Sequence, residues 1–157
     1  SNIEPNNSLL TPQCMSINNY YKQIYSIFNW AQQIPDIRVT VKEKKNYLAL
    51  YQNILNDFKD REGPLPKNVR FVDQPNKQKL TDFAHNYDVY VALGTFYPSA
   101  IYELANNISK ERLIFFDTTK LTAAFPQILN NKTMSVCRSK EELFQICESF
   151  YNLKNHT

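Results

Sequence analysis

The sequence predicts an α/β domain of the Rossmann-like type, with a six-stranded, mainly parallel sheet covered by helices on both faces in three αβα layers. Short runs rich in β-branched and aromatic residues alternate along the chain with segments whose apolar residues recur at helical spacing. Parallel strands need crossover connections, and these crossovers pack as helices against the sheet. A length of 157 residues with 43% hydrophobic content is enough for the core of one such domain.

The expected strands are short apolar runs that end at turn residues. Val89 to Leu93 is such a run, stopped by Gly94, and it is typical of a strand buried on both faces. The first strand rests on the pair Leu9 and Leu10 before Pro12. We expect strands over 8–15, 37–41, 69–72, 89–93, 112–116 and 134–137.

The expected helices show a repeated apolar face. Residues 18–34 carry a wide one, which Pro35 ends. The last helix begins after Ser139, and Glu142 three positions later completes the pattern of a capping box. We expect helices over 18–34, 47–58, 77–86, 98–105, 121–129 and 140–151.

The turn after the fourth predicted strand is the main candidate site. Gly94 ends the strand, and Pro98 fits the first turn of the following helix, which reaches Ala105. This order of strand, glycine turn and helix aims backbone N–H groups and the positive end of a helix dipole at an anion. The predicted ligand is a phosphate-bearing molecule bound at 94–99. The alternative is that Gly94 is needed only for its backbone angles.

Topology selects the same turn. In the common doubly wound order, strands one and four are neighbours at the point where the winding reverses, and ligands bind there. The loops that would meet at this switch point are 12–16 and 94–99. Gln13 in the first loop is therefore a further candidate for ligand binding.

Other function classes lack their signatures. The chain contains neither a GxGxxG dinucleotide fingerprint nor a GxxxxGK[ST] phosphate loop. Its net charge is +3, and the positive excess lies in residues 1–80, with eleven Lys and Arg against seven Asp and Glu. No basic stripe of a nucleic-acid binder is present, so a small anion or an anionic membrane surface is the expected partner.

Cysteine usage and the chain ends bear on localisation. Cys14, Cys137 and Cys147 have no metal-type spacing, so we expect reduced thiols, no metal site and a cytoplasmic protein. The sequence shows no signal peptide and no apolar run of membrane-spanning length. Residues 1–7 are expected to be a disordered tail or a cloning remnant, and 8–153 a single domain of a longer two-domain protein.

Four segments resemble the C-terminal half of GT-B-type glycosyltransferases, and more narrowly bacterial surface-polysaccharide transferases. They carry a strand, a helix ending in Tyr-Asp-Val, a small-residue turn with a Tyr-Glu helix, and a closing helix. The segments are PKNVRFVD at 66–73, LTDFAHNYDV at 80–89, SAIYELA at 99–105 and SKEEL at 139–143.

The resemblance implies that the domain binds the nucleotide and diphosphate of a sugar donor. It implies Gly94, Thr95 and Ser99 near the phosphates and Glu103 near the ribose or the sugar. Lys42 corresponds to a basic residue that some relatives carry after the second strand, but the Lys-Glu-Lys-Lys run here departs from their pattern. Lysines solvated at the strand end, and a Glu103 favoured only by the helix dipole, are the plain alternatives.

The resemblance also implies that half of the enzyme lies outside this chain. A GT-B enzyme binds the acceptor on an N-terminal domain and the donor on the C-terminal one, so the catalytic base is expected outside residues 1–157. No cofactor is expected beyond the nucleotide-sugar substrate, and peripheral attachment of the parent protein to the inner face of the membrane stays open. The alternatives are a stand-alone nucleotide-processing enzyme of the lysine-decarboxylase-like phosphoribohydrolase type, or a non-catalytic Rossmann-like partner module.

Overall fold

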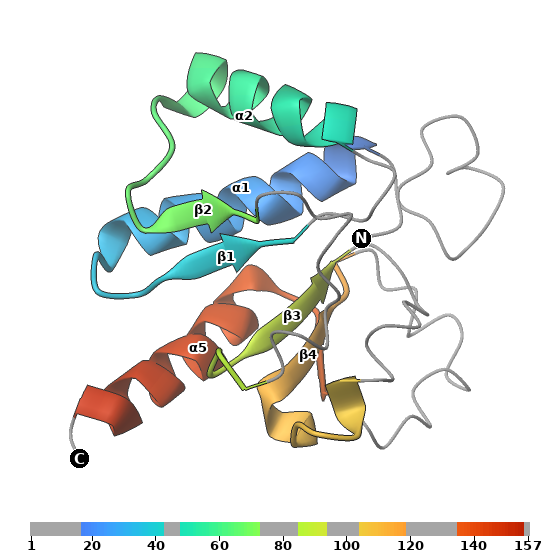
Figure 1. Cartoon of the computed structure of the whole chain (residues 1–157), viewed down its shortest axis with the longest axis vertical. Helices are drawn as coiled ribbons and strands as arrows, with labels where there is room; N and C mark the ends of the chain where they lie inside the picture. Colours follow the sequence, from blue (N-terminus) through green and yellow to red (C-terminus); the bar gives the residue numbers. More distant parts are fainter. Residues whose placement is uncertain (1–16, 43–47, 73–84, 94–103, 119–134, 156–157) are drawn as a thin grey trace, which may run out of the picture.

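The fold of this chain combines helices with parallel strands (Figure 1). The computed structural model describes residues 17–42, 48–72, 85–93, 104–118 and 135–155. In chain order the elements are α1 (Ile17–Gln33), β1 (Val39–Val41), α2 (Leu48–Glu62), β2 (Val69–Phe71), β3 (Tyr90–Leu93), the 3-10 helix η2 (Lys110–Arg112), β4 (Leu113–Phe116), β5 (Ser135–Cys137) and α5 (Lys140–Asn155).

The strands form two parallel sheets. One contains β1 and β2, and the other has the order β3, β4, β5. These pairings confirm the α/β class. The single six-stranded sheet that we expected is not seen among the described residues, whose strands form one two-stranded and one three-stranded sheet. The strand expected over 8–15 lies outside the described residues, as do most of the helices expected over 77–86, 98–105 and 121–129.

Strand β4 is the centre of the larger sheet. All four of its residues are buried, and it pairs with β3 on one side and β5 on the other. Successive side chains of a strand point to opposite faces. Leu113 and Phe115 accordingly pack in one apolar cluster with Leu104, while Ile114 and Phe116 pack in another with Leu143 of α5. The sheet is therefore covered on both faces of β4, whereas β3, for which burial on both faces was expected, alternates between buried and half-buried residues.

Helix α1 connects the two sheets through its apolar faces, and it runs between α2 and α5 in Figure 1. Phe28 is fully buried, and its ring meets Phe58 of α2 edge to face at 5.2 Å between centroids. On the side of α5, Trp30 stacks on Phe144 at 4.8 Å and donates its indole N–H to Glu148 Oε1 at 2.9 Å. These contacts explain why a wide apolar face is needed on α1.

The carboxyl ends of α1 and α2 each have an identifiable capping feature. Asn68 Nδ2 donates to Ala31 O and Ile34 O at 2.7 and 3.1 Å, which satisfies carbonyls at the end of α1. Helix α2 continues four residues beyond the expected Phe58 and is followed by Gly63, whose φ of 107° favours glycine. The prediction stopped early because it followed apolar residues, and the last turn of α2 is charged.

The capping pattern at α5 is confirmed in its main contact. Ser139 Oγ accepts a hydrogen bond from the Glu142 N–H at 3.2 Å. The Glu142 carboxylate accepts from the N–H of Arg138 at 3.2 Å, one residue earlier than in the usual box. Both contacts fix the path of the chain from β5 into α5.

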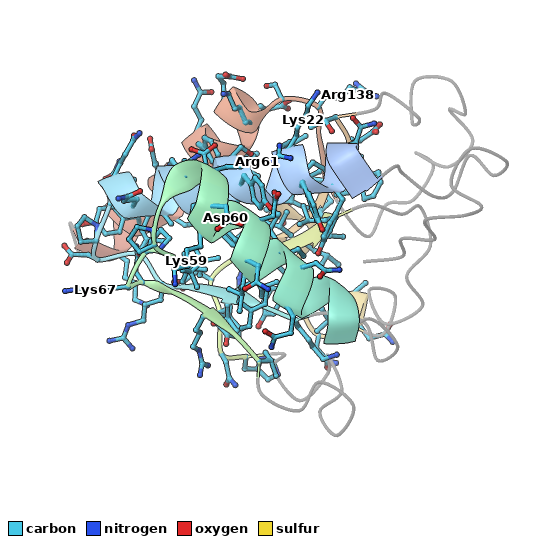
Figure 2. The ribbon with its side chains drawn as sticks, turned by 90° about the horizontal axis from the view of Figure 1, so that it is seen from above. Lys22, Lys59, Asp60, Arg61, Lys67 and Arg138 are labelled. Carbon is cyan, nitrogen blue, oxygen red and sulfur yellow. The ribbon has the colours of Figure 1, made fainter. Side chains whose placement is uncertain are left out.

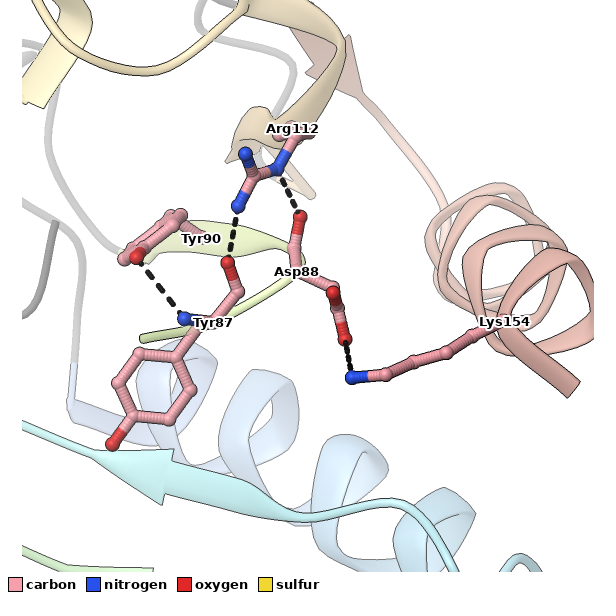
Figure 3. Close-up of polar contacts among 5 residues, drawn as sticks. All are labelled: Tyr87, Asp88, Tyr90, Arg112 and Lys154. Atoms are coloured by element: carbon pink, nitrogen blue, oxygen red, sulfur yellow. Dashed lines mark hydrogen bonds and ion pairs between the residues drawn. The ribbon is translucent and has the colours of Figure 1, made fainter. Parts of the chain in front are cut away.

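The amino ends of β3 and β4 are joined by an arginine (Figure 3). Arg112 Nε donates to Asp88 O at 2.7 Å, and its Nη2 donates to Tyr87 O. Lys154 of α5 reaches the Asp88 carboxylate at 3.4 Å, with both side chains largely exposed at 72% and 62%. The guanidinium therefore satisfies backbone carbonyls, whereas the lysine forms a surface ion pair.

Replacing Arg112 by Met should lower the free energy of unfolding by about 1–3 kcal/mol, because two carbonyls lose a charged donor. The matched variant Lys154→Met should change it by less than about 0.5 kcal/mol, because exposed ion pairs contribute little. Urea unfolding of both variants measures the difference. Equal losses would show that the arginine contacts contribute no more than the surface pair.

Candidate functional site

The edge of the molecule at which the parallel strands end is the candidate site. Because paired strands run in the same direction, their carboxyl ends meet at one edge of each sheet. Lys42 directly follows β1, Asp117 and Thr118 follow β4, and Arg138 follows β5. Below, these positions are called the carboxyl edge.

Most of the residues selected from the sequence cannot be placed at this edge. The residues concerned, which lie outside the described part of the chain, are Gln13, Gly94, Thr95, Ser99 and Glu103. Lys42 is described, and it lies half-buried directly after β1. His85 is exposed in the turn that precedes β3 and so lies on the amino side of that strand.

Two buried polar side chains lie at the end of β4, and sequence reasoning did not select them. Gln23 of α1 is 2% exposed and Asp117 is 1% exposed. Gln23 Nε2 donates to Phe116 O at 3.0 Å and to Thr118 Oγ1 at 2.8 Å. The Asp117 N–H donates to Cys137 O at 2.7 Å, which extends the β4–β5 ladder by one residue. Helix α1 is thus tied by its amide side chain to the carboxyl end of the central strand.

A signal for Gln23 was present in the sequence. It lies three residues after Tyr20 and four before Ile27, so it falls within the apolar face of α1. A polar residue on such a face is expected to have a specific hydrogen-bonding partner. Asp117 likewise follows an entirely apolar central strand directly, at the end where ligands of parallel sheets bind.

Charged side chains are unevenly arranged around this edge. Lys22 and Arg138 are on the same side of the molecule in Figure 2, and both are exposed. Lys22 lies on α1 directly before Gln23, and Arg138 belongs to the carboxyl edge because it directly follows β5. On α2 the charges are mixed, since Arg61 pairs with Asp57 at 3.0 Å. The carboxyl edge thus combines surface cations with buried hydrogen-bonding groups, which suits an anionic ligand that also has neutral polar groups.

The described cysteines are unsuited to nucleophilic or metal chemistry. Burial, followed by the charge of Glu142, raises the pKa of the Cys137 thiol to about 11. Burial likewise raises the pKa of Cys147 to about 12. Both groups are thiols at neutral pH, whereas the thiolate is the nucleophile and the metal ligand. No group of three His, Cys, Asp or Glu side chains suited to a metal ion occurs among the described residues.

A tyrosine in the core between α1 and α2 is also held protonated. Tyr25 donates its hydroxyl to Asp57 Oδ2 at 2.5 Å. Burial and this hydrogen bond to the carboxylate raise the pKa of Tyr25 far above its usual value. Ionisation of Tyr25 would therefore disrupt the contact between the two helices.

Comparison of the chain with models of protein families, with curated proteins and with solved structures finds no match. Function therefore has to be inferred from the sequence patterns and from the geometry of the carboxyl edge. Among the described helices, none has both the length and the apolar character needed to cross a membrane.

The raised pKa values of Cys137, Cys147 and Tyr25 predict that the protein loses stability in alkali. Above about pH 9 the unfolded chain releases protons that the folded state retains, so the free energy of unfolding must fall as pH rises. Below that pH these groups are protonated in both states, and stability should not depend on them. Urea unfolding at about pH 8, 9.5 and 10.5 tests the slope.

The control is Cys147→Ala, which should reduce the loss between about pH 9 and 10.5 because it removes one of the retained protons. A free energy of unfolding that stays constant or rises over this range in the unsubstituted protein would contradict the prediction.

Proposed function

We propose that this chain is the nucleotide-sugar-binding domain of a bacterial glycosyltransferase that builds a surface glycan or glycoconjugate. The observation that supports ligand binding is the arrangement of the strands. β1 pairs with β2, β3 pairs with β4, and among the described residues β1 and β3 do not pair with each other. In the doubly wound order expected from the sequence, the first strand would lie between β1 and β3, where the winding reverses and ligands bind.

Local charge supports a phosphate-bearing ligand. Gln23 contacts the carbonyl at the end of β4, so the N-terminal part of α1 lies at the carboxyl edge. The first turn of α1 carries no acidic residue, whereas that of α5 carries Glu141 and Glu142. The positive end of the α1 dipole, together with nearby Lys22 and Arg138, therefore favours an anion at this edge.

The sugar-donor role rests on the resemblance to GT-B enzymes. In that scheme the substrate is a nucleotide sugar, no further cofactor takes part, and an N-terminal acceptor domain of the parent protein supplies the other side of the cleft. The parent enzyme would act in the cytoplasm, in peripheral contact with the inner face of the membrane. The catalytic base belongs to the missing half.

The first functional prediction is that the domain binds a nucleotide. Calorimetric titration with UDP, GDP, CDP and CMP should give a weak but saturable signal with at least one of them, because half of the cleft is absent. If none of the four nucleotides binds at concentrations up to about 1 mM, the proposal is overturned. A Kd of about 1 mM corresponds to about 4 kcal/mol of binding free energy. Cleavage of a monophosphate to free base and sugar phosphate would instead favour the phosphoribohydrolase alternative.

A matched pair of serine variants tests the predicted phosphate turn. Ser99→Ala should weaken the bound nucleotide by about 1–2 kcal/mol, as expected for one hydrogen bond to a charged group, while the melting temperature holds. Ser109→Ala is the control, because Ser109 is exposed before η2 and makes no capping hydrogen bond through its side chain. If Ser99→Ala lowers the melting temperature and leaves the affinity intact, Ser99 is a helix cap and not a ligand contact.

The second functional prediction concerns activity. Holding acceptor and donor in line lowers the barrier by roughly 7–11 kcal/mol in well-oriented reactions. In our proposal, residues 1–157 provide only the donor-binding side of the cleft. The isolated chain should therefore show background rates in donor hydrolysis and sugar transfer, whereas the full-length parent should turn over. Robust transfer by the isolated chain, abolished in Glu103→Ala, would show that the site is complete in residues 1–157.

A further inference from the structure

The Gln23 carboxamide is the most unusual polar group among the described residues. Its side chain is 2% exposed, and its Nε2 makes two hydrogen bonds, to Phe116 O and to Thr118 Oγ1. Its Oε1 is buried and has no hydrogen-bonding partner. An unpaired buried acceptor is costly and uncommon in folded proteins, so it calls for a partner.

The orientation of this amide follows from its neighbours. Phe116 O is a carbonyl and can only accept a hydrogen bond, so the group facing it at 3.0 Å must be the NH₂. Turning the amide over would set two acceptor oxygens against each other and would leave Nε2 without Phe116 O. Oε1 is therefore the amide atom that has no hydrogen-bonding partner at the end of β4.

Thr118 completes the arrangement. Its Oγ1 accepts from Gln23 Nε2 at 2.8 Å, so its own O–H hydrogen points elsewhere and can be donated. Thr118 is exposed, which places the Gln23 amide only one side chain below the surface of the carboxyl edge. A hydroxyl that can donate thus stands beside an unused acceptor.

We infer that the end of β4 is a subsite for the neutral, hydrogen-bonding part of the ligand, in which Gln23 Oε1 accepts from a ligand O–H or N–H. An ionised phosphate offers only acceptors, so it cannot satisfy Oε1. The matching groups are a sugar hydroxyl or a nucleobase N–H. This inference rests on the proposed function and adds to it the direction in which the ligand lies.

The test separates the neutral part of the ligand from its phosphates. Calorimetry compares the tightest nucleoside diphosphate of the panel with inorganic pyrophosphate on the unsubstituted chain and on Gln23→Met, which keeps the side-chain volume without the amide. The variant should bind the nucleotide about tenfold more weakly and bind pyrophosphate unchanged. Thr118→Val should show the same selectivity, whereas Thr40→Val on β1 should alter neither affinity.

Ligand analogues test the same contact without any variant, so the outcome does not depend on whether Gln23→Met folds. A 2′-deoxy diphosphate and a diphosphate with a methylated base N–H are titrated into the unsubstituted chain, and the one that lacks the relevant donor should lose about tenfold. That loss should disappear in Gln23→Met if the two groups are partners.

Three results would overturn the inference. Equal weakening of nucleotide and pyrophosphate would mean that Gln23 acts through the fold. Unchanged affinity for every ligand would mean that Oε1 is satisfied by a buried water molecule. Failure of the unsubstituted chain to bind any nucleotide would remove the proposed function together with the subsite, whereas the first two results leave the proposed function standing.

Discussion

The burial of β4 on both faces is the constraint on which the rest of the structure depends. Four consecutive apolar residues cannot be covered by one layer, so helices are needed on both sides and strands on both edges. Helices α1 and α5 cover one face through Ile27 and Leu143, and the segment around Leu104 covers the other. Strands β3 and β5 both run parallel to β4.

The two edges of the larger sheet differ in the hydrogen bonding of their polar groups. At the amino edge Arg112 satisfies two backbone carbonyls, and the contacts there are structural. At the carboxyl edge Gln23 binds the last carbonyl of β4 and leaves an acceptor unused. The edge with this unsatisfied acceptor is the one at which parallel α/β proteins bind ligands, and Arg138 contributes positive charge there.

Hydrophobic periodicity was sufficient to predict the described helices and strands but not their ends. The run at 112–116 and the capping residues around Ser139 were correctly interpreted, because burial and capping leave local signals. Helices α2 and α5 run beyond their expected ends at Phe58 and Tyr151, because their last turns are polar and propensity alone continues them. Arg112 falls in η2 and not in β4, because its backbone N–H donates to Ser109 O at 3.0 Å in a 3-10 turn.

The candidate site was less predictable than the fold. Motif reasoning favoured the turn at 94–99, whose residues are outside the described part, and it passed over Gln23 because the interpretation of α1 recorded only apolar positions. The partner of Gln23 is Phe116, 93 positions away, and no local pattern encodes such a contact. Long-range polar contacts therefore have to be read from the structure.

The central claim is that ligands bind at the carboxyl edge, and backbone amide chemical shifts measured by NMR during a nucleotide titration test it most directly. The amides of Lys42, Thr118 and Arg138 should shift in proportion to occupancy, while those of Asp88 and Arg112 at the opposite edge should stay in place. Shifts confined to the amino edge, or to the exposed face of α2, would contradict the account.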